Sequence, residues 1–150
     1  MTQEEKKQLK IAACKVRLGI IEGVFAAKSG HPGGSLSAAD VLTYLYFKHM
    51  NVNPQNPRWE NRDRFVLSKG HVAVGYGPVI CDYGFMPVEG LHNFNLTGSK
   101  FGMHLDKNKI KGIDCSSGSL GHGLSLADGF ALAGRVKGQD YMVYCLTGDG

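Results

Sequence analysis

Hydrophobic residues recur at helical spacing over the first 28 residues of the chain. They are Leu9, Ala13, Val16, Ile20 and Val24. This pattern predicts one long amphipathic helix over residues 2–28, because residues three or four positions apart share one face of a helix. Thr2 and Glu5 form a capping-box sequence at its start, and Gly30 is expected to end it.

Further helical patterns follow along the chain. A second helix is expected to begin at its N-cap Ser37, with a buried face of Val41, Leu42, Leu45 and Tyr46. Others are predicted over residues 71–83, 87–94 and 123–137. In the last of them, the residues expected to face inward are Leu124, Ala127, Phe130 and Ala131. Two glycines of that helix, Gly129 and Gly134, are expected to let it pack closely on the sheet.

Two short apolar runs predict β-strands, over residues 64–68 and 141–146. Runs of this length are typical of strands that are buried on both faces of a parallel sheet. Strands separated by helices predict an α/β fold, with a mostly parallel sheet flanked by helices. Because only two strands are predicted, we expect the sheet to be incomplete within this chain.

Polar residues follow both predicted strands. Lys69, Gly70 and His71 end the first, and Gly-Asp-Gly at residues 148–150 ends the second. Ligands of open parallel sheets bind beyond the carboxyl ends of the strands. A histidine beside a helix N-terminus suits phosphate, and the carboxylate of Asp149 suits a hard cation that bridges to phosphate oxygens. An ordinary turn is the alternative for Gly-Asp-Gly.

Glycine is unusually frequent, with 21 residues in 150, and it is clustered at residues 30–34 and 118–123. Clustering favours loops that enclose a ligand over general flexibility. The first cluster presents His31, although a plain connection between helices with a surface histidine would look the same. Residues 95–115 form a long loop that contains His104, and long loops in compact domains are usually functional or disordered.

Charge and cysteine content narrow the class of protein. The formal net charge is +4, and Lys100, Lys107, Lys109 and Lys111 are in one loop, which favours weak attraction of anionic substrates. Nucleic-acid binding is not expected, because no recognition motif accompanies the charge. The four cysteines form no C-x-x-C pair and no apolar run could span a membrane, so we expect a reduced, cytoplasmic protein.

Four motifs together resemble those of transketolases, in the same order. They are Ser-Gly-His-Pro-Gly at residues 29–33, Asn-Arg-Asp-Arg-Phe-Val-Leu-Ser-Lys-Gly-His at 61–71, Ser-Gly-Ser-Leu-Gly at 117–121 and Gly-Asp-Gly at 148–150. The resemblance extends from about residue 9 to the end, and the second motif is the most specific. Deoxyxylulose-phosphate synthases differ at that motif and are the second candidate. A generic dinucleotide-binding domain is excluded, because no G-x-G-x-x-G follows an early strand.

The resemblance implies the diphosphate-domain fold that binds thiamine diphosphate and a divalent cation, Mg²⁺, Ca²⁺ or Mn²⁺. It implies transfer of a two-carbon ketol unit from a ketose phosphate to an aldose phosphate in carbohydrate metabolism, such as the pentose phosphate pathway. By position in the motifs, Asp149 corresponds to the metal ligand, and His31 and His104 to histidines that assist proton transfer on the substrate. The cofactor-binding positions are His71, Gly118, Ser119, Leu120, Gly148 and Gly150.

This sequence departs from the family pattern at three places. Met-His-Leu surrounds His104 where Gly-His-Pro is common, and His122 replaces a usual glutamine. The third place is the end of the chain, where the motif at Gly148 normally continues to a second metal ligand, an asparagine. We therefore expect residues 1–150 to be the first part of the diphosphate domain, from a fragment or a split subunit that is inactive alone.

The expected partner is a separate chain with the pyrimidine-binding domain and the glutamate that activates the cofactor, in a homodimer or heterotetramer. Sugar phosphates are the expected substrates. A non-catalytic module that keeps the fold and binds a partner is the alternative.

Overall fold

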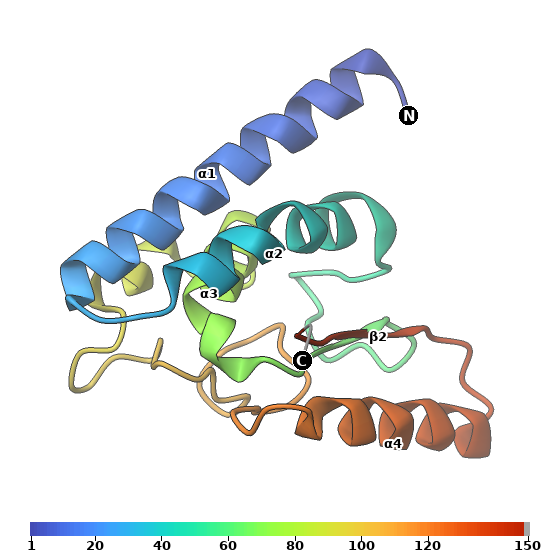
Figure 1. Cartoon of the computed structure of the whole chain (residues 1–150). Coiled ribbons are helices and arrows are strands. Elements are labelled where there is room, and N and C mark those ends of the chain that lie inside the picture. Colours follow the sequence, from blue (N-terminus) through green and yellow to red (C-terminus); the bar gives the residue numbers. More distant parts are fainter. Residues whose placement is uncertain (149–150) are drawn as a thin grey trace.

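Helices cover both faces of a two-stranded parallel sheet in the computed structural model, which describes residues 1–148 (Figure 1). The α-helices are α1 (Gln3–Ala27), α2 (Pro32–Tyr44), α3 (Ala73–Asp82) and α4 (His122–Lys137). The short helices are η1 (Leu45–His49), η2 (Gly70–Val72) and η3 (Val88–Asn93), and the strands are β1 (Arg64–Leu67) and β2 (Val143–Leu146). α1, α2 and α3 pack together on one side of the sheet, and α4 lies on the other. The predicted α/β class is confirmed.

α1 has the start and the buried face that its sequence predicts, but Lys28 rather than Gly30 caps its end. The backbone N–H of Glu5 donates to Thr2 Oγ1 at 3.1 Å, and the N–H of Thr2 donates to Glu5 Oε2 at 2.7 Å. This reciprocal capping box satisfies two N–H groups that the helix leaves free. Val16 and Ile20 are fully buried against α2 and α3, and the helix ends just before Lys28, which has a left-handed backbone (φ 50°).

α2 begins at Pro32, five residues before the predicted N-cap Ser37, so that prediction is wrong. Proline suits the first position of a helix, because its fixed φ is already helical and its missing N–H is not needed there. The hydroxyl of Ser37 instead donates to the carbonyl oxygen of Gly34. The buried face also differs: Leu42 is buried as predicted, but Val41 is 47% exposed, because small residues such as Ala38 and Ala39 make the close contact.

β1 and β2 pair in parallel register, with Arg64 opposite Val143 and Leu67 opposite Leu146. β1 is buried at three of its four residues, as its apolar run predicts. β2 is half-buried along its whole length, so the predicted complete burial is wrong for this strand. The reason is that, within residues 1–148, β1 is the only strand that pairs with β2.

α4 packs on both strands through a narrow line of small residues. Gly123, Ala127 and Gly134 are buried, and a Cβ atom on Gly134 would lie 2.9 Å from the ring of Tyr141. Gly134 therefore packs closely as predicted, but on Tyr141, which precedes β2, rather than on a strand. Gly129 has open space around it, so the same prediction is wrong there. Leu124 and Ala131 are exposed rather than inward, because the buried line of α4 is too narrow to include them.

An aromatic cluster joins η1, β1 and α3 in the core. The rings of Tyr46, Phe65 and Tyr76 are fully buried, with centroids 5.1 to 5.9 Å apart. The hydroxyl groups of Tyr46 and Tyr76 share a hydrogen bond, and burial raises the pKa of both phenols. These contacts fix the position of β1 relative to the helices around it.

The four cysteines, all in the described part of the chain, carry free thiols. No helix found over residues 1–148 has the length and hydrophobicity needed to cross a lipid bilayer.

Candidate functional site

The loop before α4 is fixed directly against the carboxyl end of β1. The hydroxyl of Ser117 donates to the carbonyl oxygen of Leu67 at 2.6 Å. A Cβ atom on Gly70 would lie 2.6 Å from the carbonyl oxygen of Ser117 and 2.8 Å from Cα of Gly118. Only glycine permits so close an approach, since real Cβ atoms do not come within 3.0 Å of such atoms. The motifs at residues 61–71 and 117–121 are thus in contact.

His31 and His71 lie side by side at this end of the strand. Their ring centroids are 5.0 Å apart, in an edge-to-face arrangement with an interplanar angle of 65°. His31 immediately precedes α2 and is exposed, whereas His71 is in η2 and is half-buried. A Cβ atom on Gly34 would lie 3.5 Å from Nε2 of His71, so the first turn of α2 also borders this ring.

His104 approaches the same region from the 95–115 loop. A Cβ atom on Gly118 would lie 3.5 Å from Cδ2 of His104, an ordinary van der Waals contact. Partial burial is the main reason that the pKa of His71 lies below its ordinary value of 6.5. The positive charges of His31, Lys69 and His104 lower the pKa of His71 further. The structure therefore brings together three histidines from segments that are far apart in the sequence.

The 95–115 loop is packed rather than disordered, and this packing holds His104 in place. Phe101, Leu105, Ile110 and Ile113 are buried at intervals along the loop. Its far end is held by Asp114, which accepts from the guanidinium of Arg62 at 2.5 Å and from the backbone N–H of Phe65 at 2.8 Å. His104 remains exposed between these anchors.

Two helices point uncapped N-termini toward this region. Neither His31 before α2 nor Gly121 before α4 makes a side-chain capping hydrogen bond. A Cβ atom on Gly123 would lie 2.6 Å from Cα of Ser68, so α4 begins against the residue that follows β1. Uncapped first-turn N–H groups and the positive end of the helix dipole favour a bound anion.

The remaining predicted residues are placed as follows. Ser119 and Leu120 are exposed in the turn before α4, with Leu120 70% exposed, and Gly148 is exposed after β2. Asp149 and Gly150 lie outside the described residues, so their roles stay predictions. Over residues 1–148, no three His, Cys, Asp or Glu side chains are grouped so as to hold a metal ion.

The donor set at this site fits a diphosphate linked to an apolar ring. Helix N-termini and the neutral ring of His71 can donate hydrogen bonds to phosphate oxygens, and exposed Leu120 offers an apolar surface. The hydroxyl of Ser68 is buried without a partner among the described residues. Sequence reasoning gave no role to Gly70 or Ser117, although a glycine directly after an apolar strand indicates a close backbone approach.

Known proteins similar to this chain over nearly its whole length are transketolases and transketolase subunits. Residues 8–150 match the family model described as transketolase, thiamine diphosphate binding domain. The chain is 39% identical over 147 residues to a 6-deoxy-6-sulfo-D-fructose transketolase subunit of Clostridium sp. (strain MSTE9), covering 98% of this chain and 54% of that protein. It is 40% identical to one subunit of the apulose-4-phosphate transketolase of Phocaeicola vulgatus, covering 95% of this chain and 50% of that protein.

Solved structures agree with the sequence relatives. The transketolase of Pichia stipitis in complex with sedoheptulose 7-phosphate matches with a TM-score of 0.90 and 35% identity, over 95% of this chain and 22% of that one. The predicted thiamine-diphosphate-binding fold is thereby confirmed. The chain spans about half the length of the two transketolase subunits and 24% of human transketolase, to which it is 39% identical. The chain belongs to the transketolase family, with residues 8–150 matching its thiamine-diphosphate-binding domain.

Proposed function

We propose that this chain is the N-terminal subunit, or the first part of that subunit, of a transketolase. In this function it transfers a two-carbon ketol unit from a ketose phosphate to an aldose phosphate, together with a chain that carries the pyrimidine-binding domain. The grouping of His31, His71 and His104 around the end of β1 is the observation that carries the proposal. The family match and the relatives that are named as transketolase subunits support it.

Thiamine diphosphate is the cofactor that we assign to this site. It supplies the electron sink for breaking and forming the carbon–carbon bond. His71 and the N-terminus of α4 would hold its diphosphate, with Mg²⁺, Ca²⁺ or Mn²⁺ bound by Asp149. The other proposed cofactor contacts are Gly118, Ser119, Leu120, Gly148 and Gly150.

His31 and His104 are proposed to act on the substrate rather than on the cofactor. Both rings are exposed, and they border half-buried His71 and Gly118 from two separate segments. Imidazoles that titrate near neutral pH can give a proton to a sugar hydroxyl and take one back. We assign the cytoplasm as the location, because free cysteines persist in reducing compartments.

The test is ketol transfer from xylulose 5-phosphate to ribose 5-phosphate, with thiamine diphosphate and magnesium present. We expect background turnover with this chain alone, and measurable turnover when the complete subunit that contains these residues is combined with the pyrimidine-domain subunit from the same genome. His104→Ala should lower that turnover by about 10²–10⁴-fold, the usual effect of losing an acid–base group. His92→Ala is the matched control, since this exposed histidine of η3 has no proposed role.

Absence of turnover in the assembled complex would overturn the proposed activity. Turnover that follows this chain alone through purification would instead overturn its dependence on a partner. In the assembled enzyme, Asp149→Ala should remove the magnesium-dependent part of cofactor binding.

A further inference from the structure

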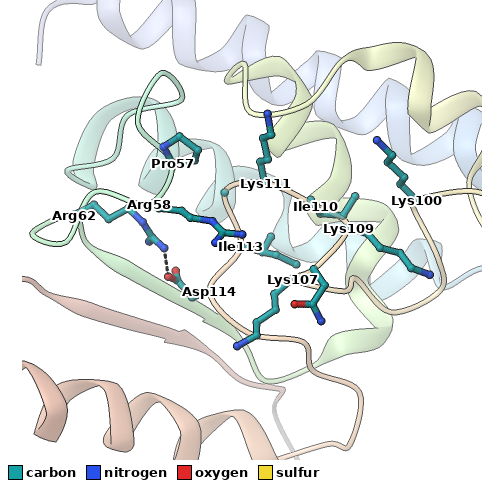
Figure 2. A pocket seen from close by; sticks show the side chains of 12 residues that line it. Pro57, Arg58, Arg62, Lys100, Lys107, Lys109, Ile110, Lys111, Ile113 and Asp114 are labelled. Carbon is teal, nitrogen blue, oxygen red and sulfur yellow. Dashed lines mark hydrogen bonds and ion pairs between the residues drawn. The ribbon is translucent and has the colours of Figure 1, made fainter.

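A second pocket, separate from the histidine cluster, is strongly basic. It has a volume of about 540 Å³ and is formed by Pro57, Arg58, Arg62 and residues 107–114, with Lys100 at its edge. Figure 2 shows Arg58 and Arg62 extending toward residues 107–114, while the lysine side chains point in different directions. The lining side chains include six cations and one carboxylate, which are Arg58, Arg62, Lys100, Lys107, Lys109, Lys111 and Asp114.

The one carboxylate does not neutralise this charge. Asp114 is already paired with Arg62 and accepts a hydrogen bond from Phe65, and Arg64 lies 3.7 Å away. A second carboxylate, Asp106, lies in the same loop outside the pocket lining; its pKa is lowered mainly by the hydrogen bond from the backbone N–H of Asn108 and in part by the charge of Lys109. Within residues 1–148, the other five cations of the pocket form no ion pair. The pocket therefore keeps a net positive charge that an anion can compensate.

The backbone that carries the lysines is held in place from beneath. Ile110 and Ile113 are buried, while the lysines between and before them are exposed. Gly112 has a left-handed backbone (φ +86°), and a Cβ atom there would lie 2.4 Å from the ring of Phe85. These buried contacts thus hold the loop backbone in place, while its lysine ammonium groups extend into solvent. The positive charge of the loop therefore stays in one region of the surface.

The pocket is connected to the proposed active site by the chain itself. His104 precedes the lysine segment by three residues, and the backbone N–H of Lys107 donates to Oγ of Ser116 at 3.1 Å. Ser116 is two residues before Gly118, where an added Cβ atom would touch the ring of His104. A ligand captured in the pocket would therefore be held next to the loop that carries a proposed substrate-binding histidine.

We propose that this basic pocket binds the phosphate group of small phosphorylated molecules, and that phosphorylated sugars are its ligands. The identity of the sugars rests on the proposed function, whereas the affinity for phosphate rests on the pocket alone. The lining contains no aromatic side chain on which nucleobases could stack, so it does not suit single-stranded nucleic acid. A pocket of this kind raises the local concentration of anionic substrate and speeds its encounter with the enzyme.

The test is an NMR titration of the whole ¹⁵N-labelled chain at low ionic strength. Three probes are compared: ribose 5-phosphate, inorganic phosphate and ribose. We expect both phosphates to shift the amide signals of residues 107–113, with ribose causing no shift there. The affinity should fall as salt is raised to about 0.15 M, because the Debye length then shrinks to about 8 Å.

A matched pair of triple variants separates the pocket from overall charge. K107Q/K109Q/K111Q should weaken phosphate binding about tenfold. Each exposed pair of a lysine with the phosphate contributes little to affinity alone, so the three losses together produce this effect. K6Q/K7Q/K10Q on α1 removes the same number of exposed positive charges and should leave binding within about twofold. Equal loss in both variants, or none in the first, would overturn the proposal.

Two other outcomes also overturn it. Ribose binding at residues 107–113 as well as ribose 5-phosphate would show that the phosphate group is not what is recognised. A single-stranded oligonucleotide that binds there more tightly than ribose 5-phosphate would assign the pocket to nucleic acid. The titration measures binding and not turnover. A failure to find ketol transfer would therefore leave the proposed phosphate binding at this pocket unaffected.

Discussion

The rings of His31 and His71 lie edge to face, with centroids 5.0 Å apart. His31 is in the segment before α2, and His71 follows β1, so the tertiary packing of the two elements creates the pair. The ring of His31 is exposed, whereas the ring of His71 is half-buried. This difference in exposure separates the roles that we assign to them.

The two histidines should therefore affect different steps in the assembled enzyme. His71→Ala should mainly weaken the binding of thiamine diphosphate, because it removes a donor to the diphosphate. His31→Ala should leave cofactor affinity unchanged and lower turnover by about 10²–10⁴-fold. Cofactor titration and turnover measured on both variants check this, and the reverse pattern would show that the two roles are exchanged.

The lowered pKa of His71 predicts how the stability of the chain depends on pH. Burial, the main cause, makes the native state bind this proton less tightly than the unfolded chain, whose histidine titrates near 6.5. The contribution to stability is then complete above pH 6.5 and is lost as the pH falls through the lowered pKa. Urea midpoints from pH 8 to 5 should fall more steeply for the wild type than for His71→Gln, and parallel curves would contradict the prediction.

The sequence was sufficient to predict the elements whose patterns are local. The capping box of α1, the buried run of β1 and the order of helices and strands all follow from short-range spacing. Burial on α2 and α4 was predicted less well. Val41 and Leu124 are exposed because helix phase depends on where a helix starts and on which neighbours cover it, and neither is encoded by hydrophobicity alone.

For the site, the resemblance to transketolases assigned His31, His71 and His104 to one site but did not predict what holds their segments together. The strand-end rule predicted a ligand-binding position for His71, which follows β1, but not its contact with His31, which lies between two helices. The anchoring of the 95–115 loop by Asp114 could not, because its partners Arg62 and Phe65 are about 50 residues away in the sequence. Such long-range pairs leave no periodic signal.

Asp114→Ala should destabilise the chain by about 3–5 kcal/mol, the usual cost of leaving one member of a buried ion pair unpaired. The side chains of Arg62 and Asp114 are only 11% and 3% exposed. Asp40→Ala is the control, because its pair with Arg17 is at the surface, with 71% and 39% exposure, and should cost no more than about 1 kcal/mol. Urea denaturation measures both, and similar losses would show that Asp114 does not anchor the loop.

Two glycines of α4 should respond oppositely to alanine. A Cβ atom on Gly123 would lie 2.6 Å from Cα of Ser68, so Gly123→Ala should push α4 away from the end of β1 and cost about 1–3 kcal/mol. Gly129 has open space, and Gly129→Ala should stabilise the helix by up to about 1 kcal/mol. Thermal unfolding distinguishes them, and a stabilising Gly123→Ala would mean that α4 does not pack against Ser68 this closely.

Gly112 and Gly98 offer a test of the loop that carries the lysines, because both have φ of +86° but different surroundings. Alanine at either position is strained by about 1–2 kcal/mol in this left-handed backbone. At Gly98 nothing lies within 4 Å of the added Cβ, so Gly98→Ala should cost only this strain. At Gly112 the added Cβ overlaps the ring of Phe85, and Gly112→Ala should cost about 1–3 kcal/mol more.

The difference between the two variants isolates the contact with Phe85, because the backbone strain is common to both. Free energies of unfolding from urea titrations give this difference directly. Phosphate titration of the same variants adds a second measurement: Gly112→Ala should weaken binding at residues 107–113, whereas Gly98→Ala should not. If the two variants are equally stable and bind phosphate equally, the packing of Gly112 on Phe85 does not hold in place the loop backbone that carries the lysines of the basic pocket.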